Sequence, residues 1–80
     1  MSKRSHAVSP KQRQNLKLLA AGWRISSVPR SIRLVDGRSE ADLRGKQFTA
    51  LRDAGWIEIE IPPFLWRISR AGLKVIGYQN

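Results

Sequence analysis

The chain has 80 residues, 41% of them hydrophobic and 26% charged, with a formal net charge of +9. We expect a flexible basic arm at residues 1–8 and one globular domain at residues 9–80. No apolar run approaches the roughly 20 residues that cross a bilayer, and the N-terminus lacks the apolar segment of a secretory signal. Cysteine is absent, which fits a reducing compartment, so a cytoplasmic protein is expected.

The charge is unevenly distributed along the chain. Residues 1–35 contain no acidic residue, whereas residues 36–80 contain all six. Solubility does not require such an asymmetry, but a surface that meets a polyanion does. Nucleic acid is therefore the leading partner, ahead of an acidic protein or a membrane surface, and a membrane is not among the partners we expect.

The first expected helix covers residues 9–22. Ser9 can cap its N-terminus and Gln12 can complete a capping box, while Gly22 ends it. Its apolar side chains recur at helical spacing: Leu16, Leu19, Ala20 and Trp23.

Residues 23–35 allow two interpretations. They contain β-branched residues, and Val28-Pro29 argues against an uninterrupted helix, while "VDGR" at residues 35–38 is a turn signal. The favoured interpretation is a short hairpin or extended pair. A short helix over residues 31–35 is the alternative. No internal repeat is apparent in the chain.

A second helix is expected within residues 40–54. Ser39 can cap its start, and the spacing of Phe48, Leu51 and Ala54 is helical. Gly45 is expected to mark a break between a short helical turn and the main helix at about residues 46–54. Gly55 is the natural stop.

Residues 56–68 are expected to form a strand, a turn and a return strand. Ile57, Ile59 and Ile61 should face in, with the two intervening glutamates facing out. Pro62-Pro63 cannot continue a ladder and should form the turn. Ser69 can cap a final short helix.

The segment "KQFTALRDAGWIEIE…LWRISRAGLKVI" resembles the C-terminal half of winged-helix DNA-binding domains of bacterial and phage regulators. The motifs that carry the likeness are "DAGWI", where a helix passes through glycine into a strand, and "SRAG", which opens a last helix. The likeness covers residues 40–77 and, more loosely, residues 9–22. It implies an α+β fold, a small winged-helix domain with a two-stranded C-terminal wing. The usual second helix is replaced by "WRISSVPRSIRLV".

Catalysis has little support in the sequence. His6 is the only histidine and lies in the expected arm, so neither a histidine-paired nucleophile nor a histidine-rich metal site can be assembled. The glycines form no phosphate-binding motif. We expect no enzyme activity, no metal and no cofactor.

Two cationic surfaces are candidates for nucleic-acid binding. The expected helix at residues 44–54 presents side-chain types that bind base edges: Arg44, Lys46, Gln47, Thr49 and Arg52. A second set suits phosphate contacts: Lys11, Arg13, Lys17, Arg24, Arg30, Arg33, Arg67 and Arg70. Ordinary solvated faces are the competing interpretation of both sets.

The expected wing is apolar and uncharged at its tip, which does not suit contact with DNA. Phe64 and Leu65 are candidates for a protein interface, either a homodimer or a partner site, or they complete the core. Trp23, Trp56 and Trp66 are assigned to the core.

The leading hypothesis is sequence-specific binding of double-stranded DNA by a transcriptional regulator or accessory factor. A module of this size is expected to need a dimer or a co-bound partner for useful specificity. The alternative is a winged-helix adaptor or inhibitor that binds protein, for example a phage protein acting on host machinery. Binding of structured RNA ranks third.

Overall fold

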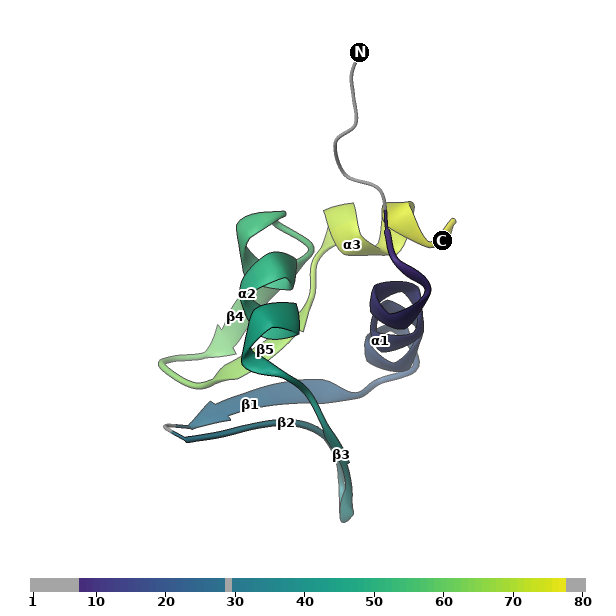
Figure 1. Ribbon diagram of the computed structural model, residues 1–80. Coiled ribbons are helices and arrows are strands. Elements are labelled where there is room, and N and C mark those ends of the chain that lie inside the picture. The colour runs from purple at the N-terminus through teal and green to yellow at the C-terminus, as the bar shows by residue number, and fades with distance from the viewer. Residues whose placement is uncertain (1–7, 29, 78–80) are drawn as a thin grey trace.

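The computed structural model describes residues 8–28 and 30–77, so the expected arm lies outside the described residues except for Val8. The described chain is a small α+β fold of three helices and a five-stranded antiparallel sheet (Figure 1). In chain order the elements are α1 (Pro10–Ala20), β1 (Arg24–Val28), β2 (Ser31–Asp36), β3 (Ser39–Asp42), α2 (Gly45–Asp53), β4 (Ile57–Ile61), β5 (Leu65–Ile68) and α3 (Arg70–Val75).

The sheet has the strand order β3-β2-β1-β5-β4, and α1 and α2 pack on one of its faces (Figure 1). Side chains alternate between the two faces of a strand. Ile25 of β1 lies opposite Leu34 of β2 and Trp66 of β5, and these residues face the helices. Their sequence neighbours, such as Arg24, therefore project from the other face, which we call the open face.

The core lies between the sheet and the two longer helices. Its most buried apolar members come from both layers: Leu16, Leu19, Ile25, Leu34, Leu43, Phe48, Leu51, Trp56 and Ile57. Trp23 and Trp66 pack against this cluster and are partly buried. The assignment of all three tryptophans to the core is confirmed.

The hairpin expected in residues 23–35 is confirmed, since β1 and β2 pair antiparallel and no helix forms at residues 31–35. The helical turn expected after Ser39 is wrong. Ser39–Asp42 instead form β3, because the turn at Gly37 (φ 61°) returns the chain alongside β2 and pairs Ala41 with Leu34. The helix α2 then begins at Gly45.

Two details at helix starts also differ from expectation. Ser9 caps α1 by accepting a hydrogen bond from the Gln12 amide, but the Gln12 side chain does not close a capping box. It reaches out to α2 and donates to the Gln47 carbonyl oxygen. At α2 the Gln47 side chain accepts a hydrogen bond from the Arg44 amide.

The inward orientation expected for the β4 isoleucines holds for Ile57 and for Ile59, which lies opposite Trp66, but only Ile57 is buried. Ile59 and Ile61 are 39% and 52% exposed. β4 is an edge strand, so nothing covers its outer side. The pairing with β5 also shifts register between Ile59 and Ile61, and such a bulge re-aims the side chains beyond it.

The joint between α2 and β4 is closed by the segment that opens α3. Ser69 donates from its hydroxyl to the Gly55 carbonyl at 2.6 Å and from its amide to the Trp56 carbonyl at 2.9 Å. It also caps α3 by accepting from the Gly72 amide. A Cβ at Gly72 would lie 2.3 Å from the Trp56 carbonyl oxygen, so glycine is required for this close approach.

Two helix-to-hairpin segments of the chain have similar helix ends, which was not expected from the sequence, although the faces of their strands are reversed, since Ile25 is buried and Glu58 is exposed. A first unit (α1, β1 and β2) and a second unit (α2, β4 and β5) have matching residues at one constant separation. The matched pairs are Gln14 with Gln47, Leu18 with Leu51, Ala21 with Ala54, Gly22 with Gly55, Trp23 with Trp56, and Pro29 with Pro62.

Hydrogen bonding at the two helix ends supports this correspondence. The Trp23 amide donates to the Leu18 carbonyl at 3.1 Å, and the Trp56 amide donates to the Leu51 carbonyl at 3.0 Å. The glycine before each tryptophan has a positive φ, and β1 and β4 are strands of equal length. The hairpins stand side by side in the sheet as β2-β1 and β5-β4. The units differ in the next element of the chain, which is β3 after the first unit and α3 after the second.

Candidate nucleic-acid interface

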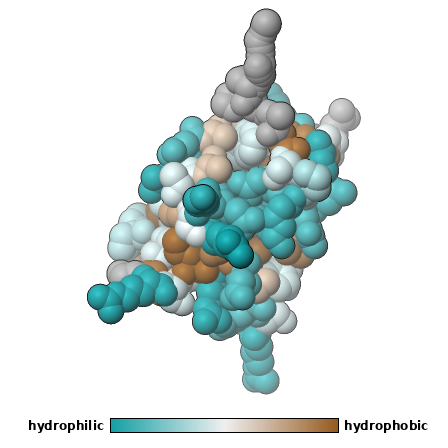
Figure 2. Space-filling model, in the orientation of Figure 1, coloured by the Kyte–Doolittle hydropathy of each residue, from teal (hydrophilic) through white to brown (hydrophobic). Residues whose placement is uncertain are grey.

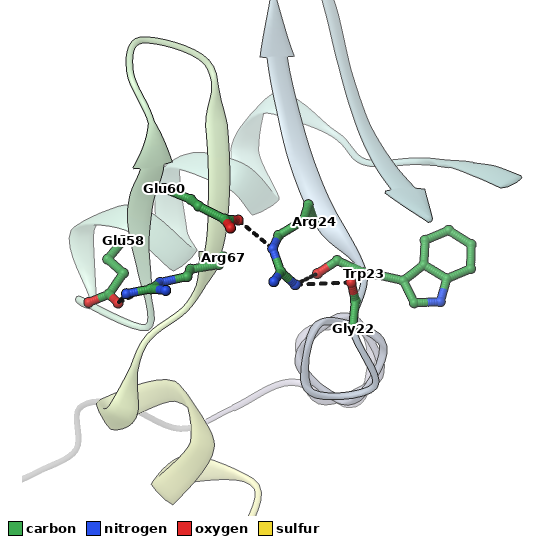
Figure 3. Close-up of polar contacts among 6 residues, drawn as sticks. All are labelled: Gly22, Trp23, Arg24, Glu58, Glu60 and Arg67. Carbon is green, nitrogen blue, oxygen red and sulfur yellow. Dashed lines mark hydrogen bonds and ion pairs between the residues drawn. The ribbon is translucent and has the colours of Figure 1, made fainter. Parts of the chain in front are cut away.

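The glutamates of the sheet are paired with arginines on the open face. Glu58 of β4 lies opposite Arg67 of β5, and these side chains are 2.9 Å apart. Glu60 binds Arg24, whose guanidinium also donates to the carbonyl oxygens of Gly22 and Trp23 (Figure 3). A third pair joins Arg33 to Glu40 at 2.7 Å. These pairs neutralise much of the charge on this face.

The remaining cations lie off the strands. Several exposed side chains form no ion pair with another residue of the described chain: Lys11, Arg13, Lys17, Arg30, Arg38, Arg44, Lys46, Arg70 and Lys74. They belong to the three helices, the residue before α2 and the two turns that flank β2. Unpaired positive charge is thus concentrated on the helices and turns.

The five side chains expected to contact bases differ in their surroundings. Arg44, Lys46 and Thr49 are exposed. Gln47 is half-buried, and its side-chain oxygen is held by the Arg44 amide. The Arg52 guanidinium lies 5.6 Å from the Phe48 ring centroid and 3.5 Å from the Asp53 carboxylate. The first turn of α2 is therefore the part with the most accessible cations.

The first turns of α1 and α2 lie side by side. The Gln12 side chain donates to the Gln47 carbonyl oxygen at 3.1 Å, and it accepts from the buried Asn15 amide at 2.9 Å. Neither helix has an acidic residue in its first turn. Figure 2 shows hydrophilic surface over α1 and the start of α2 on this face. We call Lys11, Arg13, Arg44 and Lys46 the paired-turn surface.

The expected phosphate contacts fall into two groups. Lys11, Arg13 and Lys17 are exposed on α1, Arg30 on the β1–β2 turn and Arg70 on α3. Arg24, Arg33 and Arg67 are instead held by glutamates on the open face. The sequence could not separate these groups because strand register decides which arginine meets which carboxylate.

A groove of about 380 Å³ connects the β1–β2 turn with the start of α2. Its lining residues are Arg30, Ser31, Ile32, Arg33, Asp42, Leu43 and Gly45. Arg30 is exposed and has a positive φ of 67°. The groove thus has basic and acidic side chains in its lining, since Asp42 lies beside the two arginines.

Apolar exposure is concentrated at the turn ends of β1 and β4. Val28, Ile59, Ile61 and Phe64 are 37%, 39%, 52% and 40% exposed, and the Phe64 carbonyl accepts a hydrogen bond from Ser27 beside Val28. Leu65 is half-buried. The sequence pointed to Phe64 and Leu65 and missed the other three, and for Ile59 and Ile61 the reason is that strict alternation in β4 indicated burial.

Trp66 connects β5 to α2 and β1. Its ring meets Phe48 edge-on with centroids 5.4 Å apart, and its indole N–H donates to the Ser27 hydroxyl at 3.0 Å. α2 is therefore fixed against the sheet by an aromatic contact on its inner side, and its outer side remains exposed.

Residues 8–28 and 30–77 contain no cluster of three or more His, Cys, Asp or Glu side chains that could hold a metal ion. Within the same ranges no helix is long and apolar enough to cross a membrane. No protein-family model, curated protein or solved structure gives a significant match to this chain.

Proposed function

We propose that the protein binds double-stranded DNA in a sequence-specific manner, with α2 in the major groove and α1 on the backbone. The observation that carries this proposal is the charge partition: the cations of α1 and of the start of α2 are unpaired, whereas the arginines of the open sheet face are bound by glutamates. A duplex offers the dense negative charge that such a surface matches.

A winged-helix arrangement is part of this proposal, and the order of the elements supports it. α2 passes through Gly55 into the hairpin of β4 and β5, which takes the place of the wing, and β1 pairs with β5 beside it. In this proposal the hairpin of β2 and β3 replaces the second helix of a winged-helix domain. The protein is then a small regulator or accessory factor of bacterial or phage type.

The contacts follow from side-chain chemistry. Arg44 and Lys46 can donate to the acceptors of guanine, and Thr49 can contact either a base edge or a thymine methyl group. An α-helix fits the major groove, and α2 is roughly 13 Å long at 1.5 Å per residue. Lys11, Arg13 and Lys17 then position the protein by phosphate contacts, which carry no sequence information.

A titration of duplex DNA, duplex RNA and single strands over a salt series tests this function. We expect preference for duplex DNA, with log K falling linearly as log salt rises. After selection of a preferred site from a random-sequence pool, the Arg44→Ala/Thr49→Ala variant should lose discrimination between that site and a scrambled duplex. Wild-type affinity no tighter than about 10⁻⁴ M at physiological salt, the weak end of non-specific binding, contradicts the proposal. Preference for duplex RNA favours the structured-RNA alternative.

A protein-binding adaptor or inhibitor is the second candidate. It is favoured by the exposed apolar group at the wing end, Val28, Ile59, Ile61 and Phe64, since such patches mark protein interfaces. The Ile61→Lys/Phe64→Lys variant separates the two functions. It should leave duplex binding intact if the protein acts on DNA through its helices, whereas an adaptor shows negligible duplex binding in wild type and variant alike.

A further inference from the structure

We infer that a line of hydrogen bonds from the core holds Arg44 in position for base contact, so that Gln12 and Gln47 are positioning residues of the proposed interface. This inference rests on the proposed duplex binding and adds how the base-reading end of α2 is held relative to α1. We call Asn15, Gln12, Gln47 and Arg44, joined by their hydrogen bonds, the interhelix bridge.

The bridge begins in the core and ends at the surface. The side-chain amide of Asn15, a residue only 2% exposed, donates to the Gln12 side-chain oxygen at 2.9 Å. Gln12 donates from its side-chain nitrogen to the Gln47 main-chain carbonyl at 3.1 Å. The Gln47 side-chain oxygen accepts from the Arg44 main-chain amide at 3.1 Å. A buried residue of α1 is thereby connected to the exposed N-cap of α2.

Gln12 is the central member of the bridge. Its side-chain oxygen and its side-chain nitrogen are both bonded, and a glutamine amide bonded at both atoms has one preferred orientation, because only the nitrogen can donate. Within residues 8–28 and 30–77, no other hydrogen bond joins α1 to α2. Apart from apolar packing on the shared core, the spacing of these two helices therefore depends on Gln12.

This spacing matters because the two sides of the paired-turn surface have different tasks in the proposed function. Lys11 and Arg13 bind phosphates, whereas Arg44 and Lys46 contact bases. Phosphate contacts fix the register of a protein on the duplex, so the base contacts fit only if α2 keeps its position relative to α1. Non-specific binding depends on phosphate contacts alone. A broken bridge should therefore reduce sequence discrimination and leave non-specific affinity unchanged.

Two substitutions at Gln12 test the bridge. Gln12→Glu separates its two bonds, because a carboxylate still accepts from Asn15 but cannot donate to the Gln47 carbonyl. Gln12→Met removes both bonds without a change of charge. Gln14 is an exposed neighbour in the same helix, so Gln14→Glu and Gln14→Met are the matched controls.

Affinity is measured for a selected duplex and a scrambled duplex at one salt concentration and at a temperature where circular dichroism shows each variant folded. The exchange rate of the Arg44 main-chain amide proton is measured by NMR in the free protein.

We expect the ratio of selected to scrambled affinity to fall about 5- to 10-fold in both Gln12 variants relative to their controls, an amount limited by the net free energy of one hydrogen bond. Affinity for the scrambled duplex should match that of the controls, because the phosphate contacts are the same. The Arg44 amide should exchange faster in both Gln12 variants than in the controls, since release of the Gln47 carbonyl loosens the start of α2.

Unchanged discrimination in the folded Gln12 variants overturns the positioning role. An equal loss of affinity on both duplexes also overturns it, since Gln12 would then act on binding in general. If the wild type shows no preference for duplex DNA, the proposed function fails, and amide exchange still decides whether the bridge exists. An Arg44 exchange rate that does not respond to Gln12→Glu refutes the bridge itself.

Discussion

At the scale of single residues, the half-buried polar contact between α1 and α2 stands out. Gln12 bridges the Asn15 amide and the Gln47 carbonyl, so one side chain both satisfies a buried amide and joins two helices. Buried polar groups without partners cost about 1–3 kcal/mol each. Gln12 therefore couples the stability of the core to the geometry of the surface above it.

Gln12→Ala tests this coupling. The free energy of unfolding is expected to fall by about 1–3 kcal/mol, because Asn15 loses its acceptor in a buried position. The fall can be measured by urea denaturation followed by tryptophan fluorescence. Gln14→Ala, on an exposed neighbour in the same helix, is the matched control and should change stability by less than about 0.5 kcal/mol. Equal effects of the two substitutions would show that the bridge does not stabilise the fold.

Gly72 provides a second residue-scale prediction. Gly72→Ala would place a methyl group 2.3 Å from the Trp56 carbonyl oxygen and 2.8 Å from the Ile68 side chain. Forced displacement of α3 should destabilise the protein by about 1–3 kcal/mol, with a lower midpoint in urea. Gly45→Ala is the control, since a Cβ there meets nothing within 4 Å. A stable Gly72→Ala variant would mean that α3 is not held against the joint.

At the scale of elements, the similar ends of α1 and α2 predict paired effects of substitution. Gly22 and Gly55 have φ values of 117° and 78°, which side chains other than glycine rarely adopt. Gly22→Ala and Gly55→Ala should each cost about 1 kcal/mol or more, as measured by thermal unfolding. Both substitutions lower stability for the same reason, the positive φ of the backbone. Gly55→Ala also disturbs the Gly55 carbonyl that Ser69 contacts. If alanine at both positions left the stability unchanged, the ends of α1 and α2 would not depend on glycine.

Local sequence signals were sufficient for most elements. Caps at Ser9 and Ser69 and stops at Gly22 and Gly55 located the helices, because these residues act within one helical turn. β3 was missed because "SEAD" has little strand character, and only its pairing with β2 makes it a strand. The likeness of the two helix ends was missed because the segments share few residues outside those ends and the prolines of their hairpin turns.

The candidate site was predictable in part. The exposure of Lys46 followed from helical spacing around Phe48 and Leu51, whereas Arg44 is exposed as the N-cap that precedes α2. The ion pairs of Arg24, Arg33 and Arg67 did not, since each depends on which strand lies alongside. The contact between Gln12 and Gln47 was equally out of reach, because it joins residues far apart in sequence.

At the scale of the whole molecule, the two faces of the sheet have different electrostatic roles. Ion pairs between exposed groups contribute little to stability, typically up to about 1 kcal/mol. The pairs of the open face therefore matter more for where free charge lies than for holding the fold. They restrict unpaired cations to the helices and turns.

Glu58→Gln/Glu60→Gln tests this partition by releasing Arg67 and Arg24. The free energy of unfolding should change by less than about 1 kcal/mol per pair. The slope of log K against log salt on duplex DNA should stay unchanged, because the open face is turned away from the duplex in the proposed orientation. An increase in slope of about 2 would instead place the released arginines on phosphates.

The charge partition also affects events before any contact is made. A body whose surplus positive charge lies mostly to one side experiences a torque in the field of a polyanion, and it turns that side forward while still separated by about a Debye length. Productive encounters then outnumber those expected from random tumbling. Added salt should consequently slow association more than it hastens release.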